Sequence, residues 1–101
     1  MRKRKRLTPQ RHAVFELAPG LLLIFKPRGH GEEAHGHPHR QRLRVLSGLL
    51  MIRTARQSTV LRASSPPLTL AAGRTHATVA LRDTWVVAER RPGRTPPGNF
   101  P

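Results

Sequence analysis

The chain has 101 residues, of which 19 are Lys or Arg and 5 are Asp or Glu, and its net charge is +14. This length suits one small domain, and the positive charge is typical of proteins that contact nucleic acid or anionic surfaces. The absence of cysteine excludes disulfides, thiolate metal sites and cysteine nucleophiles.

The first segment is strongly basic, with the letters RKRKR at positions 2–6. Residues 1–10 are predicted to form a disordered arm, which is either a flexible tail or a nucleic-acid-binding arm. No apolar segment of the kind found in secretory signals follows it, and no apolar run reaches the ~18 residues of a membrane span. We therefore expect a cytoplasmic protein.

Short apolar runs separated by turn residues follow, and residues 11–91 are predicted to form one domain. In chain order the expected strands are Ala13–Leu17, Leu21–Phe25, Arg40–Val45, Leu49–Arg53, Thr59–Arg62, Leu68–Leu70, His76–Leu81 and Thr84–Ala88. About eight short strands at close spacing are typical of a small all-β sandwich or barrel. A barrel is favoured because closure leaves no open edge strand. Residues 92–101 are predicted to be an irregular tail rich in Pro and Gly.

The segment Arg40–Val45 alternates strictly between basic and less polar residues. Arg40, Arg42 and Arg44 point to one side, and Gln41, Leu43 and Val45 point to the other. This period of two predicts a strand with one wet face and one buried face. The arginines are either the solvated face of that strand or a stripe that binds anions or nucleic acid.

Histidines crowd into residues 30–39, at His30, His35, His37 and His39. If residues 35–45 are extended throughout, His35 and His37 share a face with Gln41, and this face is the buried one. A turn at Pro38 would release His39 from that face, because proline is poorly tolerated within a paired strand. Imidazoles on one face are candidate metal ligands.

A further ligand has to come from another segment. His76 is the main candidate, because it starts an apolar run directly after the turn at residues 72–74. His12 and His30 are weaker candidates, since one lies near the basic arm and the other in a glycine-flanked loop.

The spacing around the histidines resembles a known motif. The chain has Gly29, five residues, His35-Gly36-His37, three residues, Gln41, six residues and Gly48. This arrangement resembles the first motif of the cupin superfamily, with glutamine where that motif has glutamate. The second cupin motif is matched in part by Gly73-Arg74-Thr75-His76. Its other positions are occupied by Ser65, Ala71 and Ala80 in place of glycine, proline and asparagine.

The resemblance covers about residues 13–90 and implies a small RmlC-like jelly-roll β-barrel. It also implies one divalent metal ion at the mouth of the barrel, with His35, His37, Gln41 and His76 as ligands. Cupins commonly dimerise, so the resemblance further implies a homodimer.

Glutamine changes the expected metal chemistry, because its neutral carbonyl oxygen replaces a negative ligand. The bound ion would keep its full charge, so affinity falls and an anion is favoured as an extra ligand. Such a nitrogen-rich site suits Zn, Fe, Mn, Ni or Cu. The alternative is a barrel that holds no metal, in which Gln41 and the histidines line a polar pocket.

Two further features have two readings each. Trp85 is either a core residue of the last strand or a wall of the pocket. Glu32 and Glu33 either orient a ligand histidine or are solvated loop residues.

Three hypotheses for function follow. The first is a metal-dependent enzyme, of the oxygenase or isomerase type, that acts on a small molecule. The second is a binding or sensor module for a small molecule, with or without metal. The third is a basic nucleic-acid-binding protein that uses its N-terminal arm.

Overall fold

The computed structural model describes residues 11–36 and 38–92. This part of the chain consists of nine strands and no helix: β1 Ala13–Ala18, β2 Leu21–Lys26, β3 Gly31–His35, β4 His39–Ser47, β5 Leu50–Arg53, β6 Ser58–Leu61, β7 Leu68–Leu70, β8 His76–Ala80 and β9 Thr84–Pro92. It therefore holds no helix that is long and apolar enough to cross a membrane. The predicted arm at residues 1–10 lies outside the described residues, as does the predicted tail beyond Pro92.

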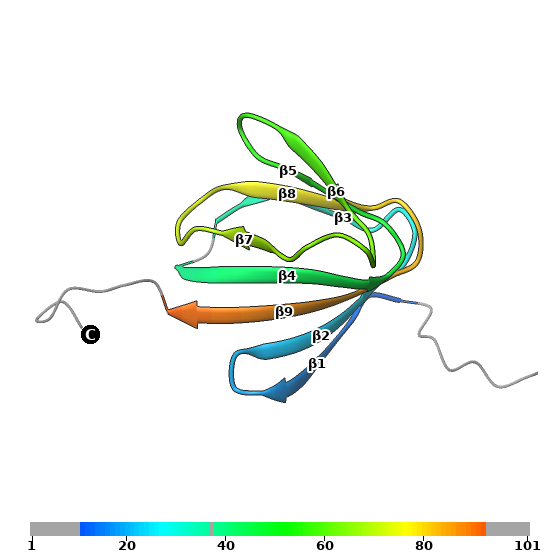
Figure 1. Ribbon diagram of the computed structural model, residues 1–101, viewed down its shortest axis with the longest axis horizontal. Helices are drawn as coiled ribbons and strands as arrows, with labels where there is room; N and C mark the ends of the chain where they lie inside the picture. The colour runs from blue at the N-terminus through cyan, green and yellow to red at the C-terminus, as the bar shows by residue number, and fades with distance from the viewer. Residues whose placement is uncertain (1–10, 37, 93–101) are drawn as a thin grey trace, which may run out of the picture.

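The strands form two antiparallel sheets that lie as two layers (Figure 1). The five-stranded sheet has the order β1-β2-β9-β4-β7, and the four-stranded sheet has the order β3-β8-β5-β6. This all-β, jelly-roll-like architecture confirms the predicted fold class. The two sheets are not closed into one barrel. Each sheet therefore has open edge strands, contrary to the expectation that closure of a barrel removes them.

The strand β3 was not predicted from the sequence. Its residues, GEEAH, carry no apolar alternation, and glycine and glutamate are depleted in strands. The segment is extended because it pairs with β8 at the edge of the four-stranded sheet. Residues 35–45 are therefore not extended throughout, so the condition under which His35 and Gln41 share one face of a strand is not met. The chain leaves one sheet at His35 and enters the other at His39.

The core lies between the two sheets. Its buried side chains come from both layers: Leu22, Ile24, Leu43, Val45, Leu50, Ile52, Leu61, Leu70, Val86 and Ala88. The predicted alternation in β4 is confirmed, since Gln41, Leu43 and Val45 are buried while Arg40, Arg42 and Arg44 are exposed.

Trp85 does not take either of its predicted places. Val86 and Ala88 on the same strand face the core, so Trp85 points to the other side of the sheet. There its ring packs against Phe25, with 5.0 Å between ring centroids, and against Phe15, with 6.3 Å. Trp85 therefore stabilises the outer face of the five-stranded sheet.

Gly48, which closes the first motif, has a strict structural role. Its φ angle is +97°, and an added Cβ would overlap the carbonyl oxygen of Asp83 and the side chain of Thr84. Thr84 is fully buried, and its hydroxyl donates to the carbonyl of Leu49 and accepts from the N–H of Leu49. The close approach at Gly48 thus joins the turn between the sheets to the start of β9.

Candidate functional site

A cavity of about 130 Å³ opens between the two sheets. Its walls come from both layers, because β2, β4 and β9 of one sheet and β3, β5 and β8 of the other all contribute residues. Apolar side chains form part of the lining. The polar lining residues are His12, Lys26, Glu32, His35, Gln41, His76, Thr78 and Arg90.

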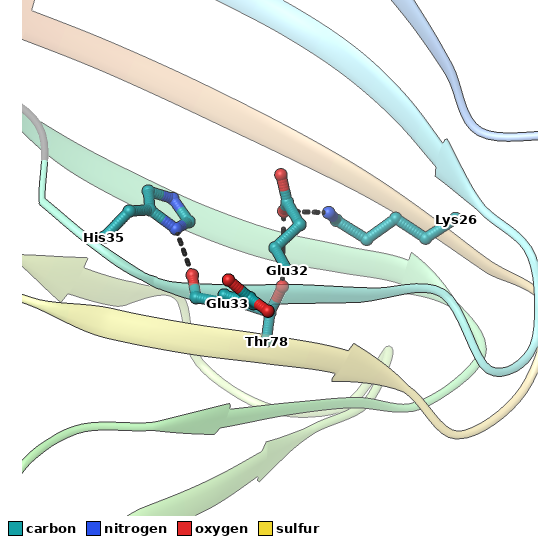
Figure 2. Close-up of polar contacts among 5 residues, drawn as sticks. All are labelled: Lys26, Glu32, Glu33, His35 and Thr78. Carbon is teal, nitrogen blue, oxygen red and sulfur yellow. Dashed lines mark hydrogen bonds and ion pairs between the residues drawn. The ribbon is translucent and has the colours of Figure 1, made fainter.

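His35 and His76 lie side by side at the rim of the four-stranded sheet. They are cross-strand partners in the pairing of β3 with β8, and their ring centroids are 4.6 Å apart. The Nδ1 atom of His35 donates to the carbonyl of Glu33 at 2.6 Å (Figure 2), and Nδ1 of His76 donates to the carbonyl of Arg74 at 3.2 Å. A carbonyl oxygen only accepts, so each Nδ1 carries hydrogen and the lone pair of the neutral ring is on Nε2. Backbone carbonyls commonly orient metal-binding histidines in this way.

His76 is held in the neutral form that a metal ligand requires. Burial lowers the pKa of His76 below 6.5, and the nearby charges of His35 and Lys26 lower it further. The hydrogen bond to the Arg74 carbonyl and the charge of Glu32 oppose this effect without reversing it. The ring is therefore neutral near pH 7.

Gln41 comes from the opposite sheet and faces the same cavity. The residue is 6% exposed, and its Oε1 atom is buried with no hydrogen-bond partner within residues 11–36 and 38–92. A buried acceptor without a donor is costly and rare in folded proteins. Its position in the cavity wall indicates that a cation or a hydrogen-bond donor fits beside it.

Three of the four residues implied by the cupin resemblance therefore line one cavity: His35, Gln41 and His76. The fourth, His37, lies outside the described residues. Among the residues that the structure describes, no group of three or more His, Asp or Glu side chains is placed to hold a metal ion. The nitrogen and amide donors that are present fit a divalent transition metal, although two histidines and one amide make an incomplete set.

An ion pair that the sequence did not predict lies in the same cavity. Lys26, which is 5% exposed, donates to Oε1 of Glu32 at 2.5 Å, and the hydroxyl of Thr78 donates to the same oxygen at 3.3 Å (Figure 2). Burial raises the pKa of Glu32, but the hydrogen bond and charge of Lys26 outweigh it and lower the pKa to about 2. Glu32 is thus a partly buried strand residue, whereas Glu33 is exposed. The solvated-loop interpretation is wrong for Glu32.

The remaining histidines occupy different places. His12 lines the cavity and stacks on His30, with 4.2 Å between ring centroids. Partial burial lowers the pKa of His12, and the charges of His30 and Lys26 add to this effect. The Nε2 atom of His30 is buried without a partner in the described part of the chain. His39 starts β4 and is not part of the cavity wall.

Arg90 is another cavity residue that the sequence did not predict. It lies directly opposite Gln41 in the pairing of β4 with β9, and its Nε atom is buried without a partner in the described segments. The alternation of β9 contains the signal, because residues 84, 86 and 88 face inward and residue 90 continues their face. The predicted strand ended too early, at Ala88, to include it.

No protein-family model and no curated protein matches the sequence. Solved structures do resemble the fold. A cupin superfamily protein from Desulfitobacterium hafniense DCB-2 has a TM-score of 0.71 and 13% identity, over 89% of this chain and 84% of that chain. KdgF from a Halomonas species has a TM-score of 0.66 and 21% identity, over 89% and 86%.

An RmlC-like cupin from Shewanella frigidimarina NCIMB 400 has a TM-score of 0.65 and 16% identity, over 89% of this chain and 94% of that chain. Identities this low establish the fold and leave the chemistry to the residues of this chain. The nine strands, the two-sheet order and these three similarities agree with the resemblance seen in the first motif. The chain has the fold of the cupin superfamily.

Proposed function

We propose that this protein is a small-molecule-binding cupin that holds one divalent metal ion with His35, His37, Gln41 and His76. The observation that carries the proposal is the buried Oε1 of Gln41, which has no partner among the described residues and shares a cavity with His35 and His76. A divalent ion would satisfy this oxygen. Each of these histidines donates its Nδ1 hydrogen to a backbone carbonyl, so the lone pair of the neutral ring is on Nε2.

When bound, such an ion supplies Lewis-acid or oxygen-activating chemistry to a small substrate. The protein's own residues define the rest of the site. Gln41 contributes no negative charge, so the ion retains its full charge and favours an anionic ligand. The Lys26–Glu32 pair lies on one side of the cavity, and apolar side chains form part of its lining.

Elemental analysis of untagged protein, loaded in turn with Zn, Fe, Mn, Ni and Cu, tests the proposal. We expect one equivalent of metal in the wild type and its loss in His76→Ala and His35→Ala. His39→Ala is the matched control, since His39 lies outside the cavity wall, and it should keep the metal. Gln41→Glu should bind metal more tightly than the wild type, because it adds a negative ligand. A wild type without stoichiometric metal, or a His76→Ala variant that keeps it, would contradict the proposal.

A metal-free binding or sensor module is the second candidate. The observation that favours it is the Lys26–Glu32 ion pair, which already places two opposite charges in the cavity. In this case, we expect small-molecule binding to be unchanged by a chelator. Dimer formation and cytoplasmic location, both predicted from the sequence, stay predictions.

A further inference from the structure

The cavity wall contains one hydrogen-bond acceptor and one donor that have no partner among the described residues. Gln41 and Arg90 are direct partners in the pairing of β4 with β9, and both line the cavity. Oε1 of Gln41 is an acceptor and Nε of Arg90 is a donor. Both atoms are buried, and neither has a hydrogen-bond partner within the described residues. The two atoms are therefore presented to a third group that can serve both.

The charge balance of the cavity specifies the sign of that group. Lys26 and Arg90 are the cations of the described lining, and Glu32 is its carboxylate. Glu32 is already engaged by Lys26 and by the hydroxyl of Thr78. The positive charge of Arg90 is thus left without a counter-ion on the cavity wall, and a low-dielectric site favours an anion beside it.

The size and the remaining walls specify the rest of the ligand. A cavity of about 130 Å³ has room for about four water molecules, so a short ligand suffices to fill it. The apolar part of the lining consists of Val14, Ile24, Leu43, Leu50 and Val86. They suit a short aliphatic chain. A planar carboxylate also matches the fork of a guanidinium better than a point charge does.

We propose that the cavity binds a short monocarboxylate that also carries a hydroxyl, with its carboxylate at Arg90 and its hydroxyl beside Gln41. Gln41 and Arg90 are opposed on one face of the paired strands, so a single short ligand can carry one group to each residue. The inference uses the cavity of the proposed function, but the contact with Arg90 does not require the metal. In the metal-free protein the hydroxyl donates to Oε1 of Gln41.

Titration of the full chain with D- and L-lactate, followed by NMR of labelled protein, tests this inference. Lactamide is the neutral analogue of the same shape, and inorganic phosphate is the competing anion. We expect at least one lactate enantiomer to bind at least tenfold more tightly than lactamide or phosphate, with the largest shifts at the amides of residues 41 and 90. Equal binding of lactate and lactamide would overturn the inference, and so would preferential binding of phosphate.

The variant Arg90→Gln should weaken lactate binding at least tenfold, and Arg90→Lys should weaken it less because it keeps the charge. Arg91→Gln is the matched control, since Arg91 is the next residue on the strand and its side chain is 63% exposed. Thermal unfolding of each variant confirms that it is folded. An Arg90→Gln variant that binds lactate as well as the wild type does would overturn the inference.

Repeating the titration with chelator separates this inference from the proposed function. Arg90-dependent lactate binding that survives chelation supports the anion site even if no metal is ever found. A protein that binds stoichiometric metal but shows no dependence on Arg90 retains the metal site and loses the anion site.

Discussion

The two faces of β4 show how one strand serves two environments. On the inner face, Gln41, Leu43 and Val45 are 6%, 5% and 2% exposed. On the outer face, arginine occupies the three alternate positions and is exposed at each of them. The inner row changes from apolar to polar at Gln41, which lines the cavity together with its apolar neighbour Leu43. An inner polar residue therefore marks the site, whereas outer charges carry no such information.

The largest expected effect comes from placing the same charge on each face in turn. Val45→Asp buries a carboxylate among core side chains, with no cation beside it, and should cost about 4 kcal/mol or more. Arg44→Asp places the same group in water and should change the free energy of unfolding by about 0.5 kcal/mol or less. Urea denaturation measures both. Similar losses for the two variants would break the distinction between the faces.

The next effect concerns a hydroxyl on the inner face of β9. Thr84→Val keeps the shape of a fully buried side chain but removes its hydrogen bonds to both backbone groups of Leu49. We expect a loss of about 1–3 kcal/mol, because the N–H of Leu49 loses its acceptor, whereas the Leu49 carbonyl keeps the N–H of Leu81. Thr69→Val, at an exposed position of β7, is the control and should be nearly neutral. Thermal denaturation of the two variants measures this difference. Equal stability of Thr84→Val and Thr69→Val would contradict a structural role for the Thr84 hydroxyl.

A charge on the inner side needs a partner, and the pH dependence of stability should reveal it. The pKa of Glu32 is about 2 in the folded protein and 4.5 without these contacts, so the unfolded chain binds more protons between these values. The stabilisation is complete above pH 4.5 and is lost as the pH falls toward 2. Because the Glu32 side chain is 39% exposed, solvent screening reduces the effect to about 1–2 kcal/mol.

Glu32→Gln tests this expectation, with the exposed Glu33→Gln as its control. The free energy of unfolding is measured in urea at several pH values between 2 and 6. The Glu32→Gln variant should lose less stability over this range than the wild type does, and Glu33→Gln should follow the wild type. Parallel profiles for wild type and Glu32→Gln would show that Lys26 does not stabilise the ionised carboxylate.

Much of the fold can be predicted from the alternation of apolar and polar residues along single strands. The pattern in β4 predicted both faces correctly, because burial of one face alone fixes which residues point inward. The strand β3 escaped prediction because its polar residues are extended by pairing with β8, which is a property of the folded chain. For the same reason the sequence could not reveal that His35 and Gln41 lie on different sheets.

The site was predictable in part. The resemblance selected His35, Gln41 and His76, and the structure brings these three to one cavity. Lys26 and Arg90 were missed although each continues an apolar inner row by one step, after Ile24 and after Ala88. The predicted strands ended where hydrophobicity ended. A strand that continues into a polar cavity therefore places a polar lining residue just beyond its last apolar position, where an apolar pattern does not detect it.

The smallest expected effect on stability belongs to the outer arginines. Replacing Arg40, Arg42 and Arg44 together by glutamine should change the free energy of unfolding by about 0.5 kcal/mol or less for each residue, because these side chains are solvated. If this face is only a solvated surface, the salt dependence of binding to a single-stranded oligonucleotide should also be unchanged. Fluorescence anisotropy between 50 and 200 mM salt measures it. If the three arginines contact three phosphates, their replacement should instead make the slope of log K against log salt less steep by about 2. A variant lacking positions 1–6 is the comparison. If the slope changes in the arginine variant, nucleic acid binds to the sheet, and the outer face of β4 is a second functional surface.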